Sequence, residues 1–453
     1  MPPANTSRNH HTVVVIGAGP AGLSACAEFL DAGVQIILIE AQRNLGGRAA
    51  SYLHPESGEI LDPGPHTILE SNRHVLGLLA RVGTRHLIKF APSLKIRFVH
   101  PTKGSVNFHC PKLPVPYGFL WGVLTHKFLS FSDRLQAIHL GRFLASADDE
   151  TPDISVAEWF DDRKVSRRAR SFFWEPLIYA TLNNDPGRIS LKSLAQTFKM
   201  GLLAPGQKSG LGLPSADWGR LVTGNLPDQI RCRGGQVLTG TRVRKIWIED
   251  GRAQGVILSE NRRIPSDAVI SALPPWNLAK LLPVVPKWLQ PCLLFSWSPI
   301  VSLHWIHVDP LPVATPVAVL ESPIQWIFSR PASSGDGKVV LSTVTGGEPC
   351  MSFLSGRKQG RQSATAEIAS VVRDLFSTWH PGEEHRMVLR TIRRATITIG
   401  PGQSHLRAGP DTDVPGLWIA GDWTDTSLPP TLESAVLSGV RAARFAVEWL
   451  KSH

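Results

Sequence analysis

TVVVIGAGPAGLSACAEFLDAGVQIILIE, residues 12–40, is the stretch that decides the fold class of this chain. Its first apolar run, Val13–Ile16, is continuous, as in a strand buried on both faces of a parallel sheet. A glycine-rich turn follows, then an amphipathic stretch that ends at Gly33, and then a second apolar run, Val34–Ile39. A strand, a glycine turn, a helix and a second strand in this order are typical of a dinucleotide-binding βαβ unit.

The glycines of the turn, Gly17, Gly19 and Gly22, have the GxGxxG spacing. Gly17 permits a tight turn, Gly19 lets a pyrophosphate approach the backbone, and Gly22 allows the helix to pack closely on the strand. The helix start, which includes Pro20 and Ala21, offers free N–H groups and a positive dipole to phosphates. The sequence therefore predicts a phosphate site at this turn.

An acidic residue completes the unit. Glu40 ends the second strand, 23 residues after Gly17, and Ala41 follows it. A carboxylate at this place accepts a hydrogen bond from a ribose hydroxyl. Because the glycine motif lies between a strand and a helix and is followed by this acid, we expect dinucleotide binding rather than a chance glycine turn.

Gly46, Gly47 and Arg48 come next, and they resemble the GGR segment of the FAD-dependent amine oxidase and phytoene desaturase superfamily. In that superfamily the glycines let the backbone approach the cofactor, and the arginine serves the pyrophosphate region. The resemblance therefore implies FAD as the cofactor. No second GxGxxG follows a strand, so a nicotinamide site is not expected and the electron donor for the flavin is unknown.

The segment GLWIAGDWTDTSLPPTLESAVLSG, residues 416–439, resembles the closing motif of the same superfamily. A strand over Leu417–Ala420 is expected to lead to the ribitol and pyrophosphate, and a helix that starts after a Pro-Pro turn is expected to face the pyrimidine end of the flavin. A helix N-terminus stabilises negative charge on reduced flavin. The resemblance assigns cofactor contacts to five residues here: Gly421, Asp422, Thr431, Leu432 and Glu433.

A third segment, Thr239–Pro274, reads as three strands, with Asp250 and Gly251 as a hairpin turn. It resembles the adenine side of the superfamily's site, and this implies backbone contacts from Val243 to adenine.

We expect an α/β fold, α+β overall, in which a discontiguous Rossmann-type FAD-binding domain receives an inserted substrate domain of mixed sheet and helices. The FAD-binding domain is predicted to comprise residues 1–95, 210–275 and 400–453. The substrate domain, which would face a membrane, is predicted to comprise residues 96–209 and 276–399.

Nearly the whole chain resembles the hydroxysqualene dehydroxylase family, also called squalene-associated FAD-dependent desaturases. The blocks FFWEPLIYATLNN (172–184) and GDWTDTSLPPTLESAVLSG (421–439) carry this resemblance most specifically. Two segments depart from the family pattern: Asp62–His66 reads DPGPH where the family has DNGQH, and 426–431 reads TSLPPT where the family has TG.PAT. The resemblance implies a C30 isoprenoid substrate whose allylic hydroxyl is replaced by a hydride from reduced flavin N5, a step in the synthesis of hopanoids.

Such a reaction needs an acid for the leaving hydroxyl, a dry pocket for the developing allylic cation, and a short hydride path. The candidate acids are Glu175, His66 and Asp62, which lie in segments that the family places near the flavin or the substrate. Each also has an ordinary interpretation, as a helix-start charge, a satisfied polar residue or a turn residue. Three aromatic side chains are candidates for stabilising the cation: Phe173, Trp174 and Tyr179.

Three alternatives remain at this point. A carotenoid or phytoene desaturase has the same cofactor and a lipid substrate, with hydride flowing in the opposite direction. An amine oxidase would need a polar or aromatic amine cage, which the many apolar segments do not favour. A non-enzymatic prenyl-lipid carrier on the same fold is disfavoured by the intact glycine motifs.

The composition bounds the class of protein. The chain has 453 residues, and 48 Lys and Arg against 37 Asp and Glu give a net charge of +11. An apolar fraction of 42% with 19% charged residues excludes a disordered chain. The five cysteines are scattered without a CxxC pair, so neither a disulfide framework nor a metal site is expected.

Charge and apolar segments together favour a lipid surface. Pro111–Phe131 is apolar and aromatic, and it is either a pair of core helices or a surface that dips into a membrane. Residues 288–308 are long enough to span a bilayer, but their prolines and alternation favour strand and buried loop. Basic residues cluster at Arg163, Lys164, Arg167, Arg168 and Arg170. No nucleic-acid-binding motif accompanies them, so we expect an anionic membrane surface as a partner and a cytoplasmic protein peripherally associated with the inner membrane.

Overall fold

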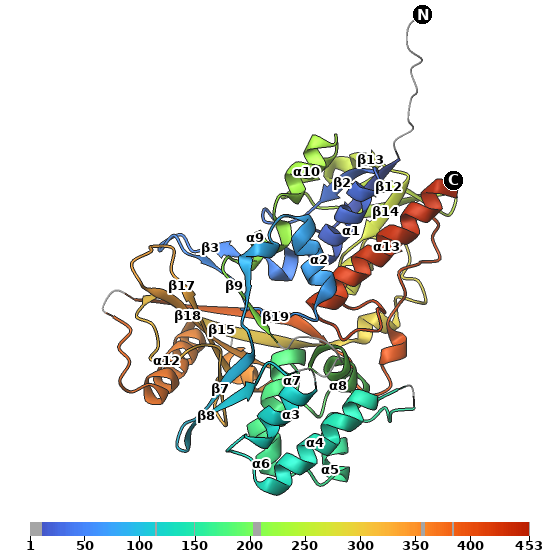
Figure 1. The fold of residues 1–453 in the computed structure, drawn as a ribbon. Coiled ribbons are helices and arrows are strands. Elements are labelled where there is room, and N and C mark those ends of the chain that lie inside the picture. The colour runs from blue at the N-terminus through green and yellow to red at the C-terminus, as the bar shows by residue number, and fades with distance from the viewer. Residues whose placement is uncertain are drawn as a thin grey trace, which may run out of the picture.

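The computed structural model describes residues 11–113, 116–148, 150–202, 210–354, 358–382 and 385–452. A five-stranded parallel sheet lies at the top of Figure 1, in the order β10-β2-β1-β14-β20. Its strands are β1 (Thr12–Ile16), β2 (Gln35–Ile39), β10 (Gln236–Leu238), β14 (Ala268–Ser271) and β20 (Leu417–Ile419). The sheet therefore takes strands from three separate parts of the chain.

Helices α1 (Pro20–Asp31) and α13 (Leu432–Ser452) pack against each other beside this sheet (Figure 1). Their backbones come close at Gly439, where a Cβ atom would lie 1.9 Å from the Ala21 carbonyl oxygen. Ser24 of α1 donates a hydrogen bond to the Val436 carbonyl across the same contact, at 2.9 Å. The last helix of the chain is thus held directly on the first.

Residues 239–274 form one strand more than the sequence predicts. β11 (Lys245–Glu249), β12 (Arg252–Ile257) and β13 (Arg263–Pro265) make an antiparallel sheet. The predicted third strand is divided, because β14 leaves this hairpin to pair in parallel with β1. Asp250 and Gly251 both have positive φ, as the predicted hairpin turn requires.

A seven-stranded sheet, in the order β19-β15-β18-β17-β16-β7-β8, forms the second large layer. Its strands are β7 (Leu94–His100), β8 (Gly104–Cys110), β15 (Ser296–Val308), β16 (Val317–Val319), β17 (Trp326–Pro331), β18 (Val339–Gly346) and β19 (Arg386–Thr398). One face packs on α12 (Lys358–Leu375), as Figure 1 shows. Residues 288–308 end in β15, which confirms the predicted strand. The predicted buried loop is wrong, because Leu293 and Leu294 lie in a short helical turn before β15 and are 39% and 79% exposed.

Helices α3 to α8 gather at the bottom of Figure 1 around an aromatic core that includes Phe108, Phe119, Phe173 and Trp174. Their bounds are α3 (Tyr117–Leu124), α4 (Phe131–Ser146), α5 (Val156–Asp162), α6 (Arg167–Ala169), α7 (Glu175–Leu182) and α8 (Leu191–Thr197). Residues 114–115 of the predicted membrane segment 111–131 lie outside the described residues. Across the described ranges, no helix is both long and apolar enough to cross a membrane.

Short elements join the two large sheets. β5 (Ile68–Leu69), β6 (Ile88–Phe90) and β9 (Leu211–Pro214) form a small sheet, and β3 (Tyr52–Leu53) pairs with β4 (Ile60–Leu61). The remaining α-helices are α2 (Arg73–Arg81), α9 (Trp218–Thr223), α10 (Leu226–Cys232) and α11 (Pro275–Leu278). The loop from Leu61 to Thr67 therefore runs between β4 and β5, next to the second sheet.

Candidate functional site

The glycine turn at the end of β1 is shaped as the sequence predicts. Gly17 has φ of +97°, and a Cβ on Gly22 would lie 1.9 Å from the Gly17 carbonyl oxygen. Only glycine fits at either position. Gly19 is different, because its backbone is extended and the nearest atom to an added Cβ is the Gly47 Cα at 3.9 Å. The free space above Gly19 is where a pyrophosphate approaches the backbone in this motif.

The second glycine pair meets the first turn directly. Gly46 and Gly47 have positive φ, and a Cβ on Gly47 would lie 2.9 Å from the Gly19 Cα. The Gly46 N–H donates to the Ala18 carbonyl at 2.7 Å. Together with the uncapped N-terminus of α1, the two segments form a cradle of backbone that fits the pyrophosphate of FAD.

Glu40 lies on the adenosine side of this cradle and binds two backbone N–H groups there. Its carboxylate accepts hydrogen bonds from the N–H groups of Ala18 and Gln42, both at 2.8 Å. A carboxylate offers about four lone-pair positions, so it can still accept from a ribose. The Glu40 carbonyl accepts from the Thr241 N–H, which brings Val243 near. The N–H and C=O groups of Val243 have no backbone partner among the described residues, so both can contact adenine. Ala41, which follows Glu40, is exposed.

Arg48 and Asp422 join the two ends of the chain. The guanidinium binds both carboxylate oxygens, at 2.7 and 2.5 Å, and donates to the Ala395 carbonyl at 3.0 Å. Burial opposes the charge of Arg48, but the Asp422 carboxylate outweighs it and raises the pKa of Arg48. This pair fixes the GGR segment against the closing motif.

One side chain of the closing motif binds another helix. Gly421 has φ of +152° and lies over the Trp423 ring, where a Cβ would be 2.5 Å from Nε1. Thr431 and Leu432 lie at the start of α13, as predicted. The carboxylate of Glu433, however, accepts from the N–H groups of His74 and Val75 at 2.8 and 2.9 Å. It caps α2, so only the backbone of Glu433 is free to face a flavin.

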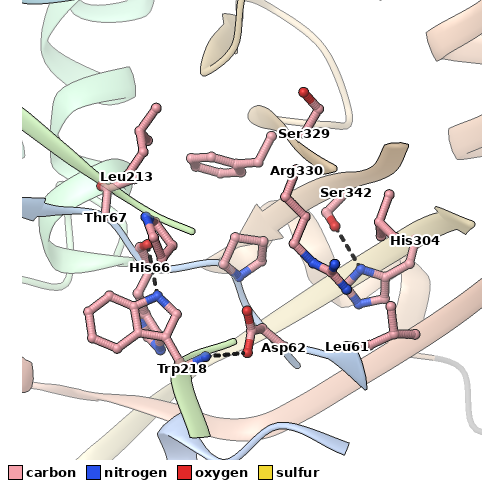
Figure 2. A pocket seen from close by; sticks show the side chains of 14 residues that line it. Leu61, Asp62, His66, Thr67, Leu213, Trp218, His304, Ser329, Arg330 and Ser342 are labelled. Atoms are coloured by element: carbon pink, nitrogen blue, oxygen red, sulfur yellow. Dashed lines mark hydrogen bonds between the residues drawn. The ribbon is translucent and has the colours of Figure 1, made fainter. Parts of the chain in front are cut away.

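A pocket of about 60 Å³ lies between the 61–67 loop, α9 and the second sheet (Figure 2). It is much smaller than the 300–1,000 Å³ of pockets that enclose whole ligands, so it accepts a functional group rather than a long chain. Its lining residues are Leu61, Asp62, Pro65, His66, Thr67, Leu213, Pro214, Trp218, His304, Phe328, Ser329, Arg330, Val340 and Ser342. Two of the three predicted acids, Asp62 and His66, are therefore brought together here.

Asp62 is held rigidly on one side. Its Oδ1 atom accepts from the Ser51 hydroxyl at 2.5 Å. The same atom accepts from the Trp218 N–H at 2.9 Å, as Figure 2 shows. Burial raises the pKa of Asp62 and outweighs these two hydrogen bonds, which lower it. A carboxyl of this kind keeps more of its proton at neutral pH than an exposed aspartate does.

His66 is close by but is disfavoured as an acid. Its ring lies edge-on to Trp218, with centroids 5.5 Å apart. Burial and the positive charge of Arg48 lower the pKa of His66 to about 4. The imidazole is therefore neutral at pH 7 and is a weak proton donor.

Glu175 is separated from these two residues. It begins α7 among the lower helices and is not one of the described residues that line the pocket. Burial raises the pKa of Glu175, and the charge of Arg170 opposes this shift. Phe173 and Trp174 are fully buried in the same aromatic core, and Tyr179 donates to Asp185 at 2.6 Å. The structure thus separates these four candidates from the pocket.

Sequence reasoning missed the residues that the second sheet contributes. His304 and Ser342 line the pocket from β15 and β18, and their side chains are hydrogen-bonded at 2.8 Å. Arg330 lines it from β17 and binds the buried Glu59 at 3.3 Å. The sequence signal for His304 is weak, because it is one of two histidines in a strand that also contains three serines.

Comparisons with known proteins agree with this arrangement. A family model for flavin-containing amine oxidoreductases matches residues 20–446. A hydroxysqualene dehydroxylase from Rhodopseudomonas palustris is 26% identical over 450 residues, covering 95% of this chain and 97% of that protein. A probable zeta-carotene desaturase from Synechococcus elongatus is 22% identical over 500 residues, covering 96% and 98%. The solved structure of cyclohexylamine oxidase from Brevibacterium oxydans has a TM-score of 0.70 at 18% identity, covering 98% of this chain and all of that one. The predicted fold class, FAD as the cofactor and the resemblance to hydroxysqualene dehydroxylases are confirmed.

Proposed function

Because the chain belongs to the flavin-containing amine oxidoreductase family and is an FAD-dependent oxidoreductase, we propose that it converts hydroxysqualene to squalene. In this reaction the allylic C–O bond breaks, the oxygen leaves as water with a proton from an acid, and a hydride takes its place on carbon. The product would feed the synthesis of hopanoids and other triterpenoids. The single observation that carries the proposal is a small, largely buried pocket with a protonatable carboxyl at its wall.

We propose that FAD lies in the backbone cradle at the end of β1. Glu40 and Val243 serve the adenosine half, Gly19 and Gly47 flank the pyrophosphate, and the Arg48–Asp422 pair lies on the flavin side. The contacts between these segments support this placement. When reduced, the flavin supplies the hydride. No second GxGxxG follows a strand in the sequence, so a nicotinamide cofactor is not expected to bind beside the flavin.

Asp62 is the acid that this arrangement favours. Burial raises the pKa of Asp62, which favours the protonated form that the leaving hydroxyl requires. Its Oδ1 is committed to Ser51 and Trp218, so the Oδ2 side of the carboxyl is the side available to a substrate. Neutral His66 and the apolar ring of Phe328 help to exclude water around it.

A phytoene- or carotene-type desaturase is the second candidate, since a relative of this chain is named as a probable zeta-carotene desaturase. A hydrocarbon substrate offers no polar group to the Nε2 atom of His304, which lines the pocket and has no hydrogen-bond partner among the described residues. Burying unpaired polar groups against a hydrocarbon is unfavourable. The polar wall of the pocket therefore favours an alcohol over a carotene.

The proposal is tested by anaerobic reoxidation of the reduced holoenzyme. Hydroxysqualene is expected to reoxidise the flavin and to yield squalene, whereas phytoene and a panel of amines are expected not to react. The complementary incubation of oxidised enzyme with phytoene detects a desaturase. Flavin reduction by phytoene or by an amine, without reoxidation by hydroxysqualene, contradicts the proposed function.

We also propose that the protein binds an anionic membrane surface through α3 and the start of α4. Phe119 and Val123 of α3 are buried, while Tyr117 and Trp121 on its other side are 63% and 52% exposed. Four further apolar side chains on or next to α3 and the start of α4 are exposed: Leu113, Leu124, Phe131 and Leu135. The two helices contact each other, and exposed apolar side chains gathered on neighbouring helices mark interaction sites.

Cations lie beside this apolar surface. Lys112 and Lys127 are exposed next to it. The side chain of Gln136 in α4 donates to the Arg163 carbonyl at 2.8 Å, which places the basic cluster next to α4. Arg163, Lys164, Arg167 and Arg168 are exposed. Arg170 is not available, because it pairs with Asp161 at 2.7 Å. Anionic headgroups would meet the exposed cations.

Replacing Tyr117 and Trp121 together by serine is expected to weaken binding to vesicles of phosphatidylglycerol and phosphatidylcholine by at least about tenfold, since each large apolar side chain contributes roughly 1.5–3 kcal/mol when buried. Binding should also weaken with salt, because surface attraction is screened over about 10 Å at 0.1 M. Cosedimentation measures both effects. The matched control replaces Val284 and Leu294, which are exposed but lie outside this surface. Equal binding to neutral and anionic vesicles at low salt would remove the electrostatic part of the proposal.

A further inference from the structure

The pocket has further polar lining, from the second sheet, that the proposed acid does not use. His304 of β15 is 1% exposed, and its Nδ1 lies 2.8 Å from the Ser342 hydroxyl of β18 (Figure 2). The other ring nitrogen, Nε2, is buried and has no hydrogen-bond partner among the described residues. A buried polar atom without a partner is uncommon in native proteins and calls for an explanation.

The position of His304 follows from the pleat of β15. Val301, Leu303 and Trp305 pack on the face that α12 covers. Side chains alternate along a strand, so Ser302 and His304 share the opposite face, toward the 61–67 loop. The Ser302 hydroxyl is also buried without a partner in the described chain. Two adjacent positions on this face thus leave hydrogen-bonding capacity unused.

The charges around His304 keep the imidazole neutral. Burial and the positive charges of Arg330 and Arg390 lower the pKa of His304 to about 3. A neutral imidazole has one nitrogen that donates and one that accepts. Nδ1 is committed to Ser342, so Nε2 is left as a single donor or acceptor on a residue that lines the pocket. A hydroxyl both donates and accepts, and it can pair with Nε2 in either tautomer.

We propose that His304 binds the hydroxyl of the substrate through Nε2 and that Ser342 holds the ring in place for this contact. The inference rests on the proposed function, because it assumes an alcohol in the pocket. It assigns His304 a role in choosing alcohol over hydrocarbon, which is distinct from the proton transfer assigned to Asp62. The hydroxyl would be bound by His304 and protonated by Asp62.

His126 provides a matched control. It is also fully buried, and neither of its ring nitrogens has a partner among the described residues. It lies among the rings of Phe98, Phe108, Phe128 and Phe173, and it does not line this pocket. Replacing either histidine by phenylalanine removes a buried imidazole, but only one replacement changes the pocket.

The test titrates oxidised holoenzyme in detergent micelles with hydroxysqualene and, separately, with squalene, and follows the flavin absorbance. His304→Phe is expected to raise the Kd for hydroxysqualene about tenfold, because a neutral hydrogen bond in a buried site contributes about this factor. The Kd for squalene should change by less than about twofold. His304→Gln, which can still donate and accept, should recover most of the affinity for the alcohol. His126→Phe should leave the Kd values for both compounds unchanged.

Ser342→Ala supplies an independent measurement if His304→Phe does not fold. It keeps the imidazole but removes the Nδ1 partner, and it is expected to weaken hydroxysqualene binding about threefold without affecting squalene. The inference is overturned if His304→Phe has the same ratio of the two Kd values as wild type. If only Ser342→Ala folds, its ratio decides instead. In either case, reoxidation of the wild-type flavin by hydroxysqualene would still support the proposed function. Failure of the wild-type enzyme to react with hydroxysqualene overturns both.

Discussion

Gly19→Val protein is expected to fold but to purify without flavin. The backbone at Gly19 is extended, with φ of −75° and ψ of 176°, which valine adopts freely. A Cβ meets nothing closer than the Gly47 Cα at 3.9 Å, so the apo fold accepts it. The branched side chain then fills the space above the turn, where the pyrophosphate must approach the N-terminus of α1. The ratio of flavin to protein absorbance measures the loss directly.

Two other glycines make this result specific. Gly22→Ala places a Cβ 1.9 Å from the Gly17 carbonyl oxygen, so it should lower the Tm of the apoprotein itself. Gly77→Ala lies on α2 with nothing within 4 Å and should behave as wild type. Added FAD should raise the Tm of wild type and of Gly77→Ala, because a ligand that binds only the native state stabilises it. It should not raise the Tm of Gly19→Val. Full flavin occupancy in Gly19→Val would mean that the phosphate site lies elsewhere.

The cofactor half of the molecule could be predicted because its signals are local. The apolar run before Gly17, the glycine spacing and Glu40 all lie within one βαβ unit. Each residue type is required there by backbone geometry, as the positive φ of Gly17 and the clash at Gly22 show. The division of the predicted third strand into β13 and β14 could not be predicted in this way, because only the parallel pairing with β1 determines where β14 begins.

The pocket could be predicted only in part, because it depends on contacts between distant segments. Asp62 and His66 come from one loop, but His304 and Ser342 meet across two paired strands. β15 contains two histidines, His304 and His307, and nothing in its local pattern distinguishes the one that lines the pocket. Glu175 was selected from a family-specific block, yet α7 packs in the lower helices. No local pattern indicated that the Glu433 carboxylate accepts hydrogen bonds from the N-terminus of α2.

Asp62→Asn is expected to keep its FAD and to lose about 10²–10⁴-fold in the single-turnover rate of flavin reoxidation by hydroxysqualene, which is the usual contribution of a general acid. Asparagine retains the Oδ1 oxygen that accepts from Ser51 and the Trp218 N–H, so the loop should keep its place.

The folded-state pKa of Asp62 is raised. An aspartate of this kind contributes stability below its unfolded pKa and loses that contribution as pH rises through the folded value. The variant should therefore have a Tm at pH 8 no lower than that of wild type.

The pH dependence and the other candidate acids decide whether Asp62 is the proton donor. The wild-type rate should fall as pH rises through the raised pKa of Asp62, and the rate of Asp62→Asn should not show this fall.

Glu175→Gln is expected to stay within about threefold of the wild-type rate, because Glu175 does not line the pocket. His66→Ala should lose far less than Asp62→Asn, since a pKa of about 4 leaves the imidazole without an acidic proton at pH 7. A substrate with a better leaving group, such as the phosphate ester of the same alcohol, needs less protonation and should be much less affected by Asp62→Asn. If Asp62→Asn reoxidises at the wild-type rate while Glu175→Gln or His66→Ala does not, the proton comes from that residue, and the pocket at Asp62 only binds the alcohol.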